Sequence, residues 1–114
     1  MPLNHNDRVS EWDEIEDSAL VQLVYASSLT LVSRLSASIF DEVECHARNY
    51  NQQHGITGTL CYGSGQFLQC IEGEKAHVFA LKQRIFADKR HKNAEILLLK
   101  PIKYRHFADW RMRL

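Results

Sequence analysis

Five side chains of this sequence could act together at one chemical site: a phenol, two primary amides and two neighbouring basic groups. They are Tyr25, Asn51, Gln69, Arg90 and His91. Gln69 is the least expected of them, because alternation along GQFLQCIEG places it between Phe67 and Ile71 on the apolar face of a strand. A primary amide buried without a partner costs about 1–3 kcal/mol. Gln69 therefore needs a polar neighbour, which could be a loop, solvent or a ligand.

The strand that carries Gln69 is expected to form a hairpin with the strand before it, through a tight turn at Gly63-Ser64-Gly65. A two-residue turn would place on the Gln69 face Ile56, Gly58, Leu60 and Tyr62. A three-residue loop would place there Thr57, Thr59 and Cys61. We favour the two-residue turn, because burial of one apolar face fixes the register. The small Gly58 would then leave room for a ligand beside Gln69.

The other candidate residues each allow two interpretations. Tyr25 lies near the end of the strand LVQLVYAS, either as a core tyrosine or as a hydroxyl presented to a pocket. Asn51 lies in the last turn of an expected helix, where an amide is a poor helix former but a good donor and acceptor. Arg90 and His91 follow a second helix, and they either complement its C-terminus or hold an anionic ligand.

Composition limits the classes of function. The 114 residues are 45% apolar and 25% charged, as in one soluble globular domain. Fourteen basic and fourteen acidic residues balance, which argues against binding along a nucleic-acid backbone. No apolar run approaches the roughly 20 residues of a membrane span, and the polar N-terminus is no signal peptide. We therefore expect a cytoplasmic protein with no direct nucleic-acid or membrane contact.

Cysteine and histidine usage gives no sign of a metal site. The six histidines are scattered, and the three cysteines lack metal-ligand spacing. Cys45, Cys61 and Cys70 are expected to be reduced and to act as small core residues.

Hydrophobic periodicity predicts the elements that must position these residues. A strand is expected at 20–27, a helix at about 38–53 that stops at Gly55, and a second helix at about 75–87 after a turn at residues 72–74. The run from Ile96 to Leu99 predicts a central strand covered on both faces. Residues 107–114 predict a final strand.

Residues 1–19 form an N-terminal extension, either a short helix or a disordered lead. Trp12 and Ile15 fall at helical spacing within it. If exposed, they would be contacts for a second subunit; the alternative is that they pack back on their own domain.

The order strand, helix, strand, strand, helix, strand, strand predicts an α+β fold. It corresponds to a ferredoxin-like βαββαββ plan, a mixed five-stranded sheet with two helices on one face. The natural ligand site is then the slot between the helices, with the sheet as its floor.

With these residues placed at such a slot, the chain resembles the BLUF domain, a blue-light sensor using FAD. Five segments carry the resemblance in order: LVYAS with Tyr25, RNYNQQHGITG with Asn51, GQFLQCIEG with Gln69, DKRH with His91, and DWRM near the end. The resemblance covers residues 20–114 and implies a flavin-binding photosensory domain there.

The resemblance implies non-covalent binding of FAD, with other flavins such as FMN also possible, and a role for each site residue. Asn51 would hydrogen-bond the polar edge of the flavin ring, and Arg90 and His91 would lie near its ribityl and phosphate end. Apolar walls would come from Val43, Leu60, Phe67 and Ile85. The photoswitch would comprise Tyr25, Gln69, Trp110 and Met112. The sequence departs from many relatives at Tyr50, where another polar contact to the flavin is common.

The implied chemistry has no net turnover, so the domain would be a switch and not an enzyme. Tyr25 would give an electron and a proton to the excited flavin and receive both back, while the Gln69 amide exchanges its donor and acceptor. The changed hydrogen bonds would then act on the strand of Trp110 and Met112. That strand would signal to an effector, a partner or a second copy, and any enzymatic output would lie elsewhere.

Three other readings use parts of the same sequence. An RNA-binding domain of related topology, or another ferredoxin-like ligand-binding module without photochemistry, is the main alternative, although the former usually has a basic, aromatic strand where this chain has GQFLQCI. A flavin photoreceptor that forms a cysteinyl adduct would need its cysteine before FLQ, whereas Cys70 follows it. A small enzyme would need a supported nucleophile or paired carboxylates, and the sequence shows neither.

Overall fold

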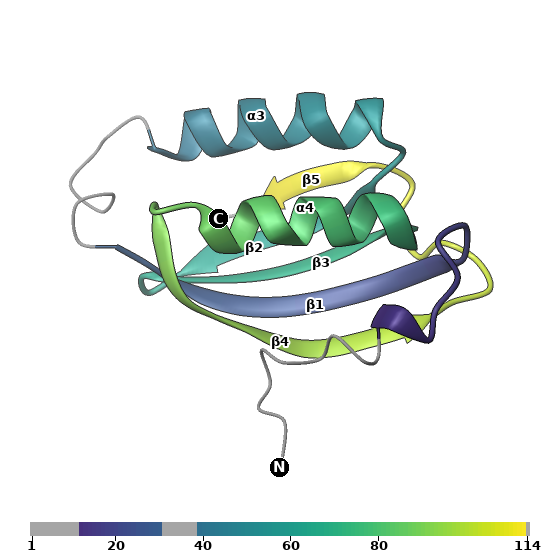
Figure 1. The fold of residues 1–114 in the computed structure, drawn as a ribbon. Helices are drawn as coiled ribbons and strands as arrows, with labels where there is room; N and C mark the ends of the chain where they lie inside the picture. The colour runs from purple at the N-terminus through teal and green to yellow at the C-terminus, as the bar shows by residue number, and fades with distance from the viewer. Residues whose placement is uncertain (1–11, 31–38, 114) are drawn as a thin grey trace, which may run out of the picture.

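The computed structural model describes residues 12–30 and 39–113. Two helices lie together on one face of a five-stranded sheet with the order β4-β1-β3-β2-β5 (Figure 1). The elements are β1 (Leu20–Leu29), α3 (Ile39–Gln53), β2 (Thr57–Gly63), β3 (Gln66–Glu74), α4 (Lys75–Ala87), β4 (His91–Pro101) and β5 (Trp110–Arg113). β5 pairs in parallel with β2, while the other strand pairs are antiparallel. This mixed sheet confirms the α+β, ferredoxin-like plan.

Strict alternation defines β1, the second strand of the sheet. Val21, Leu23, Tyr25, Ser27 and Leu29 are buried, and the residues between them are half-buried. β1 pairs with β3 on one side and β4 on the other. Tyr25 is the Cα partner of Gln69 in that register, so the phenol and the amide start from adjacent backbone positions.

The β2–β3 hairpin turns at Ser64 and Gly65, whose φ angles are 53° and 78°. Positive φ at both central residues is the signature of the type I′ turn, whose twist matches that of the flanking strands. Leu60 is consequently the Cα partner of Gln69, and Tyr62 that of Phe67. The two-residue turn is confirmed, and the three-residue loop is wrong.

Gly58 does not make room for a ligand, contrary to the expectation from the sequence. Its φ is +148°, and a Cβ placed on it would meet the carbonyl oxygen of Cys70 at 2.0 Å. Only glycine tolerates such a close approach of two backbones. Gly58 is not among the residues that line the slot.

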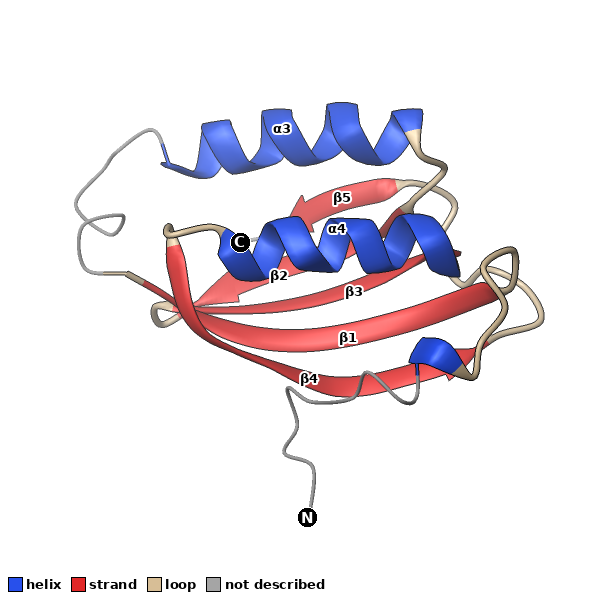
Figure 2. Cartoon of the chain, in the orientation of Figure 1, coloured by secondary structure: helices blue, strands red, loops and turns tan. Residues whose placement is uncertain are grey.

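The connections around the helices differ in one respect from the expectation. α3 ends as expected, with Gly55 at φ +64° in the left-handed position. The expected turn at residues 72–74 is absent, because β3 continues to Glu74 and α4 begins at the next residue (Figure 2). The first N–H groups of α4 are satisfied from the N-terminal extension instead: Lys75 donates to the carbonyl of Ala19 and Ala76 to that of Asp17.

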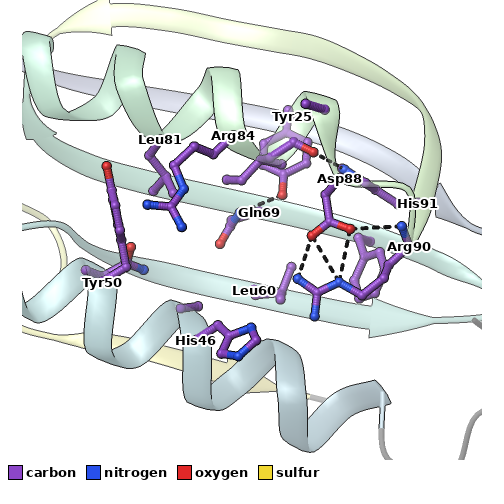
Figure 3. A pocket seen from close by; sticks show the side chains of 15 residues that line it. Tyr25, His46, Tyr50, Leu60, Gln69, Leu81, Arg84, Asp88, Arg90 and His91 are labelled. Carbon is purple, nitrogen blue, oxygen red and sulfur yellow. Dashed lines mark hydrogen bonds and ion pairs between the residues drawn. The ribbon is translucent and has the colours of Figure 1, made fainter.

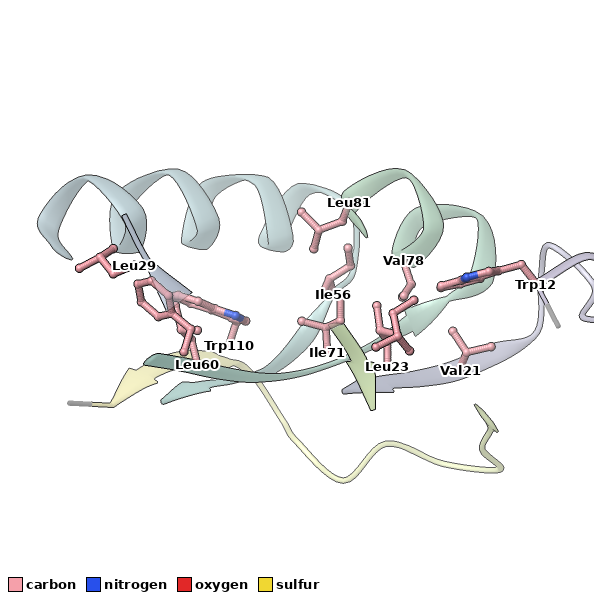
Figure 4. Close-up of a cluster of buried hydrophobic side chains, with 12 residues drawn as sticks. Trp12, Val21, Leu23, Leu29, Ile56, Leu60, Ile71, Val78, Leu81 and Trp110 are labelled. Carbon is pink, nitrogen blue, oxygen red and sulfur yellow. The ribbon is translucent and has the colours of Figure 1, made fainter. Parts of the chain in front are cut away.

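Trp12 belongs to the core of the domain. It is 2% exposed and meets Phe79 of α4 edge-on, with 5.1 Å between the ring centroids. Ile15 packs against the same core. Figure 4 shows Trp12 beside Val78 at the end of the cluster that lies between the helices and the sheet. The alternative of packing back on the domain therefore holds, and these two side chains are not exposed contacts.

β4 is an edge strand, so the expected central position of Ile96 to Leu99 is wrong. Ile96 is buried, but Leu97 and Leu98 are 50% and 37% exposed. A continuous apolar run fits a bulged edge strand as well as a central one, and the β1–β4 register shifts between Val24 and Tyr25. The three cysteines are free thiols as expected, but they are not core residues: Cys45 is exposed, and Cys61 and Cys70 are half-buried.

Candidate functional site

A cavity of about 400 Å³ lies between α3 and α4, with the sheet as its floor (Figure 3). Eight of the expected site residues line this slot: Tyr25, Asn51, Leu60, Phe67, Gln69, Ile85, Arg90 and His91. They come from β1, α3, β2, β3, α4 and the start of β4, so the fold gathers residues far apart in sequence. The side chains of Val43 and Met112 lie outside the described part of the chain.

A chain of hydrogen bonds links three buried side chains at the floor of the slot. Nε2 of Gln69 donates to the hydroxyl oxygen of Tyr25 at 2.6 Å, and Nε1 of Trp110 donates to Oε1 of Gln69 at 3.1 Å. All three side chains are at most 6% exposed. The polar neighbours that a buried Gln69 needs are therefore a phenol and an indole.

The indole fixes the orientation of the Gln69 amide. An indole N–H can only donate, so the amide oxygen must face Trp110 and the amide nitrogen must face Tyr25. Tyr25 then accepts from Gln69, which leaves its own hydroxyl proton available to a further acceptor. Rotating the amide by half a turn would set two donors against each other at Trp110.

Burial keeps the Tyr25 phenol protonated. Desolvation raises the pKa of Tyr25 well above its ordinary value, against a smaller lowering effect of the Gln69 hydrogen bond. Phe86 contacts the phenol ring edge-on at 5.6 Å between centroids and keeps water from this side. A neutral phenol is the form that holds a proton to transfer.

Asn51 presents an unsatisfied amide to the slot. The side chain is 1% exposed, and within the described part of the chain neither its amide nitrogen nor its amide oxygen has a hydrogen-bond partner. Two unpaired polar atoms at such depth are costly for a folded protein. They are complementary to a ligand whose edge carries both a donor and an acceptor.

The basic residues at the far end of the slot are largely used within the protein. Arg90 forms an ion pair with Asp88, with 2.5 Å from Nη2 to Oδ2. Burial opposes the charge on Asp88, but the hydrogen bonds and charge of Arg90 prevail and lower the pKa of the carboxyl. The ring nitrogens of His91 contact the Ser27 hydroxyl at 2.7 Å and the carbonyl oxygen of Ile85.

Two further residues frame the slot and were not singled out from the sequence as ligand contacts. The guanidinium of Arg84 lies over the Tyr50 ring at 4.3 Å, so this pair joins α4 to α3 across the slot (Figure 3). Arg84 follows Leu81 by three residues and precedes Ile85, so helical spacing placed it beside the apolar stripe. It forms no ion pair with a carboxylate among the residues that the structure describes.

Trp110 lies behind the slot, where it contacts Gln69 without lining the cavity. Its Cα partner on β2 is Gly58, and that of Met112 is Leu60. The last strand is thus connected to the site through one side-chain hydrogen bond and one parallel ladder. Trp110 is therefore buried against Gln69.

The slot fits a flat aromatic cofactor with a polar edge. Its side walls are the apolar side chains of Leu60, Phe67, Leu81 and Ile85, and the unsatisfied amide of Asn51 provides one donor and one acceptor. Among the described residues, no group of three metal-ligating side chains is found. An isoalloxazine ring has the shape and edge chemistry that these residues require.

The fold and the site define a small α+β domain with a slot between its two helices and a buried, hydrogen-bonded phenol and amide at the floor of that slot. Residues 20–113 match the family model named BLUF, whose members are sensors of blue light using FAD. The chain belongs to the BLUF family, and it carries that family's blue-light sensing function through a flavin.

Known relatives agree with this assignment. The BLUF protein BlrB, solved in its dark state, is 34% identical with a TM-score of 0.78, covering 86% of this chain and 74% of that one. A bacterial light-regulated adenylyl cyclase is 32% identical with a TM-score of 0.77, covering 83% of this chain and 28% of that one. Photoactivated adenylate cyclase subunit alpha of Euglena gracilis is 30% identical over 97% of this chain.

The chain spans only 11% of the length of that Euglena protein, so the match concerns the sensory domain. The RNA-binding alternative finds no support in these relatives. In the described part of the chain, no helix is long and apolar enough to cross a bilayer.

Proposed function

We propose that the slot holds the isoalloxazine ring of FAD, with Asn51 on its polar edge and Leu60, Phe67 and Ile85 against its faces. The single observation that carries this proposal is the buried amide of Asn51, which has no hydrogen-bond partner among the described residues, beside the apolar side chains of the cavity. Val43 would complete the apolar wall. When bound there, FAD would supply the absorption of blue light and an excited state able to take up an electron and a proton from a neighbouring phenol.

Tyr25 is the phenol in that position, and Gln69 is the side chain whose hydrogen bonds change after the transfer. Tyr25 keeps its proton because burial raises its pKa. The Gln69 amide answers a change at Tyr25 by rotating or tautomerising, since either move exchanges its donor and acceptor. Rotation also removes the acceptor that Trp110 uses, and tautomerisation weakens it by turning the amide oxygen into a hydroxyl. A change at the floor of the slot thereby becomes a change at β5.

The output then leaves through Trp110 and Met112 to a partner. The adenylate cyclases among the relatives support an effector that responds to light, and a second copy of this chain is the other candidate. We place the sensory domain at residues 20–114 and the protein in the cytoplasm. Arg90 and His91 would lie at the ribityl and phosphate end, and Arg84, which pairs with no carboxylate among the described residues, would add a further positive charge.

The test is an absorption spectrum of the purified protein in the dark and during blue illumination. We expect a flavin spectrum that shifts slightly to the red and relaxes in darkness. Gln69→Leu should keep FAD and abolish the shift, because leucine has no donor or acceptor to exchange. Gln66→Leu, on the exposed start of the same strand, is the matched control and should shift normally. A normal shift in Gln69→Leu would remove Gln69 from the switch.

Tyr25→Phe should likewise give a yellow protein without photochemistry, because the electron and proton donor is missing. Tyr104→Phe is the control, since Tyr104 is 71% exposed. An unaltered photocycle in Tyr25→Phe would transfer the donor role to another residue, and Trp110 would be tested next.

A further inference from the structure

Strand β3 holds the C-terminal segment of the chain at two places, one on each face of the sheet. Gln69 and Glu72 are three residues apart on this strand, so their side chains point to opposite faces. On the helix face, Gln69 binds the indole of Trp110. On the other face, Glu72 binds the loop that leads into β5, and Figure 4 shows this loop passing on the side of the sheet away from the helices.

Glu72 is a completely buried carboxylate, and its side chain accepts hydrogen bonds from this loop and from the neighbouring strand β1. Oε1 accepts the backbone N–H of His106 at 2.7 Å and that of Phe107 at 3.0 Å. Oε2 accepts from Nε2 of Gln22 at 2.9 Å. The side chain is 0% exposed. Hydrogen bonds to an ionised acceptor are roughly twice as strong as neutral ones, so two adjacent N–H groups on one carboxylate hold the loop firmly.

The backbone of the same residue contributes a further contact. Arg105 donates from Nη1 to the carbonyl oxygen of Glu72 at 3.0 Å and to the Thr57 hydroxyl at 2.9 Å. Three consecutive loop residues therefore contact Glu72. The N–H of Gly58 donates to the carbonyl of Asp109 at 2.9 Å, which extends the attachment to the residue just before Trp110.

We propose that Glu72 is a positioning residue that fixes the start of the output strand, so that light displaces residues 110–113 while residues 105–109 stay in place. The inference rests on the proposed switch at Gln69 and Trp110. Glu72 does not contact the slot. By holding the loop before β5, Glu72 sets the position of Trp110 at the start of that strand. This position decides whether the indole reaches the amide of Gln69.

The test uses the FAD-loaded full chain labelled with ¹⁵N, in the dark and under blue light. The sequence has two tryptophans, so two indole N–H signals are expected, and Trp12 provides the internal reference for Trp110. Amide hydrogen exchange at His106 and Phe107 reports the loop directly. In the wild type we expect light to move the Trp110 indole signal and to leave the exchange of these two amides unchanged.

Glu72→Ala should speed the exchange of the His106 and Phe107 amides by roughly tenfold or more in the dark. It should also move or broaden the Trp110 indole signal before any illumination. The red shift should remain, since Tyr25 and Gln69 are intact. Glu72→Gln keeps an oxygen acceptor and should show a smaller increase in exchange. Gln22→Ala removes only the third donor and is the matched control, with loop exchange near that of the wild type.

Wild-type exchange at His106 and Phe107 together with a wild-type Trp110 signal in Glu72→Ala would overturn the inference. If that variant does not fold, unchanged exchange in Glu72→Gln overturns it equally. A different observation would contradict the underlying switch: the absorption of the wild type shifts to the red in light while its Trp110 indole signal stays constant. The dark-state signals of the variants still judge Glu72 in that case.

Discussion

Asn51 has two buried polar atoms with no hydrogen-bond partner among the described residues, and this has opposite consequences for folding and for binding. The folded protein alone bears the cost of burying the amide, whereas a bound flavin edge would repay it. A residue of this kind favours binding of the ligand and lowers the stability of the protein without the ligand. The same trade between stability and function is common at binding sites.

Asn51→Leu should therefore change the two properties in opposite directions. Leucine has a similar volume and no polar atoms, so the protein without flavin should gain about 1–3 kcal/mol in free energy of unfolding. The affinity for FAD should fall by about tenfold or more, because the edge contacts are lost. Urea denaturation and fluorescence titration with FAD measure the two quantities. A variant that loses both stability and affinity would show that Asn51 has a structural partner.

Tyr25 makes a prediction about alkaline pH. Its pKa is raised in the folded state, so the folded protein holds this proton where the unfolded chain would release it. The resulting stabilisation is fully present below the unfolded pKa of about 10 and is lost as the pH rises through the folded pKa.

A titration of absorbance at 295 nm checks this. Wild type and Tyr25→Phe should give superimposable curves for as long as both remain folded, because Tyr25 forms no tyrosinate in that range. Only unfolding should reveal the additional phenol in the wild type. A difference between the two folded proteins near pH 10 would show that the phenol is accessible to hydroxide.

At the scale of the elements, the β2–β3 hairpin depends on one glycine far more than on another. Gly58→Ala would place a Cβ against the Cys70 carbonyl at a φ that L-residues rarely adopt, so we expect a loss of about 2–4 kcal/mol in stability. Gly63→Ala is the matched control, because no atom lies within 4 Å of its Cβ position. It should change stability by less than about 1 kcal/mol. Equal effects of the two substitutions in urea denaturation would contradict this account.

Residues 12–19 of the N-terminal extension pack on helix α4 and accept hydrogen bonds from its first turn. Trp12 packs on Phe79, and the carbonyls of Asp17 and Ala19 accept the first N–H groups of the helix. Trp12→Ala should cost about 3–5 kcal/mol, as for other buried large aromatics. It should also weaken FAD binding, because α4 forms one wall of the slot. Asp13→Ala, at an exposed neighbour, should be neutral by thermal denaturation and by flavin titration.

At the scale of the whole molecule, the sheet face opposite the helices carries exposed apolar side chains. Leu68 and Leu98 are 48% and 37% exposed, and the half-buried Val24 and Cys70 lie between them in the strand register. Such a patch is typical of an interaction surface. We expect concentration-dependent self-association in analytical ultracentrifugation, reduced in Leu68→Lys. A purely monomeric wild type at all concentrations would leave this face to an effector.

Much of this molecule could be predicted from its sequence, because alternation and helical spacing record burial directly. The pairing of Leu60 with Gln69 followed from the two-residue turn, because that register places the apolar side chains of both strands on one face of the hairpin. The errors came from backbone and edge effects that one-dimensional patterns do not carry: the close approach at Gly58 and the edge position of Leu97 and Leu98. The sequence left open whether Trp12 packs inward, and the structure decides that it does. The loop contacts of Glu72 depend on tertiary structure and leave no periodic signal. The Asp88–Arg90 pair is local, between residues two apart, but it lies in a turn that periodicity does not report.

The absence of a loop between β3 and α4 has a mechanical consequence. Gln69 on the floor and Leu81 on the wall belong to one continuous stretch of regular structure, tied on its far side by the long ladder to β1. This side of the slot is stiff. β5 lies at the edge of the sheet and pairs with β2 alone among the described strands, so it is the more compliant side. A change in the contacts of Gln69 would therefore displace β5 more than it displaces β3 and α4. β5 is also the strand through which we propose that the signal leaves.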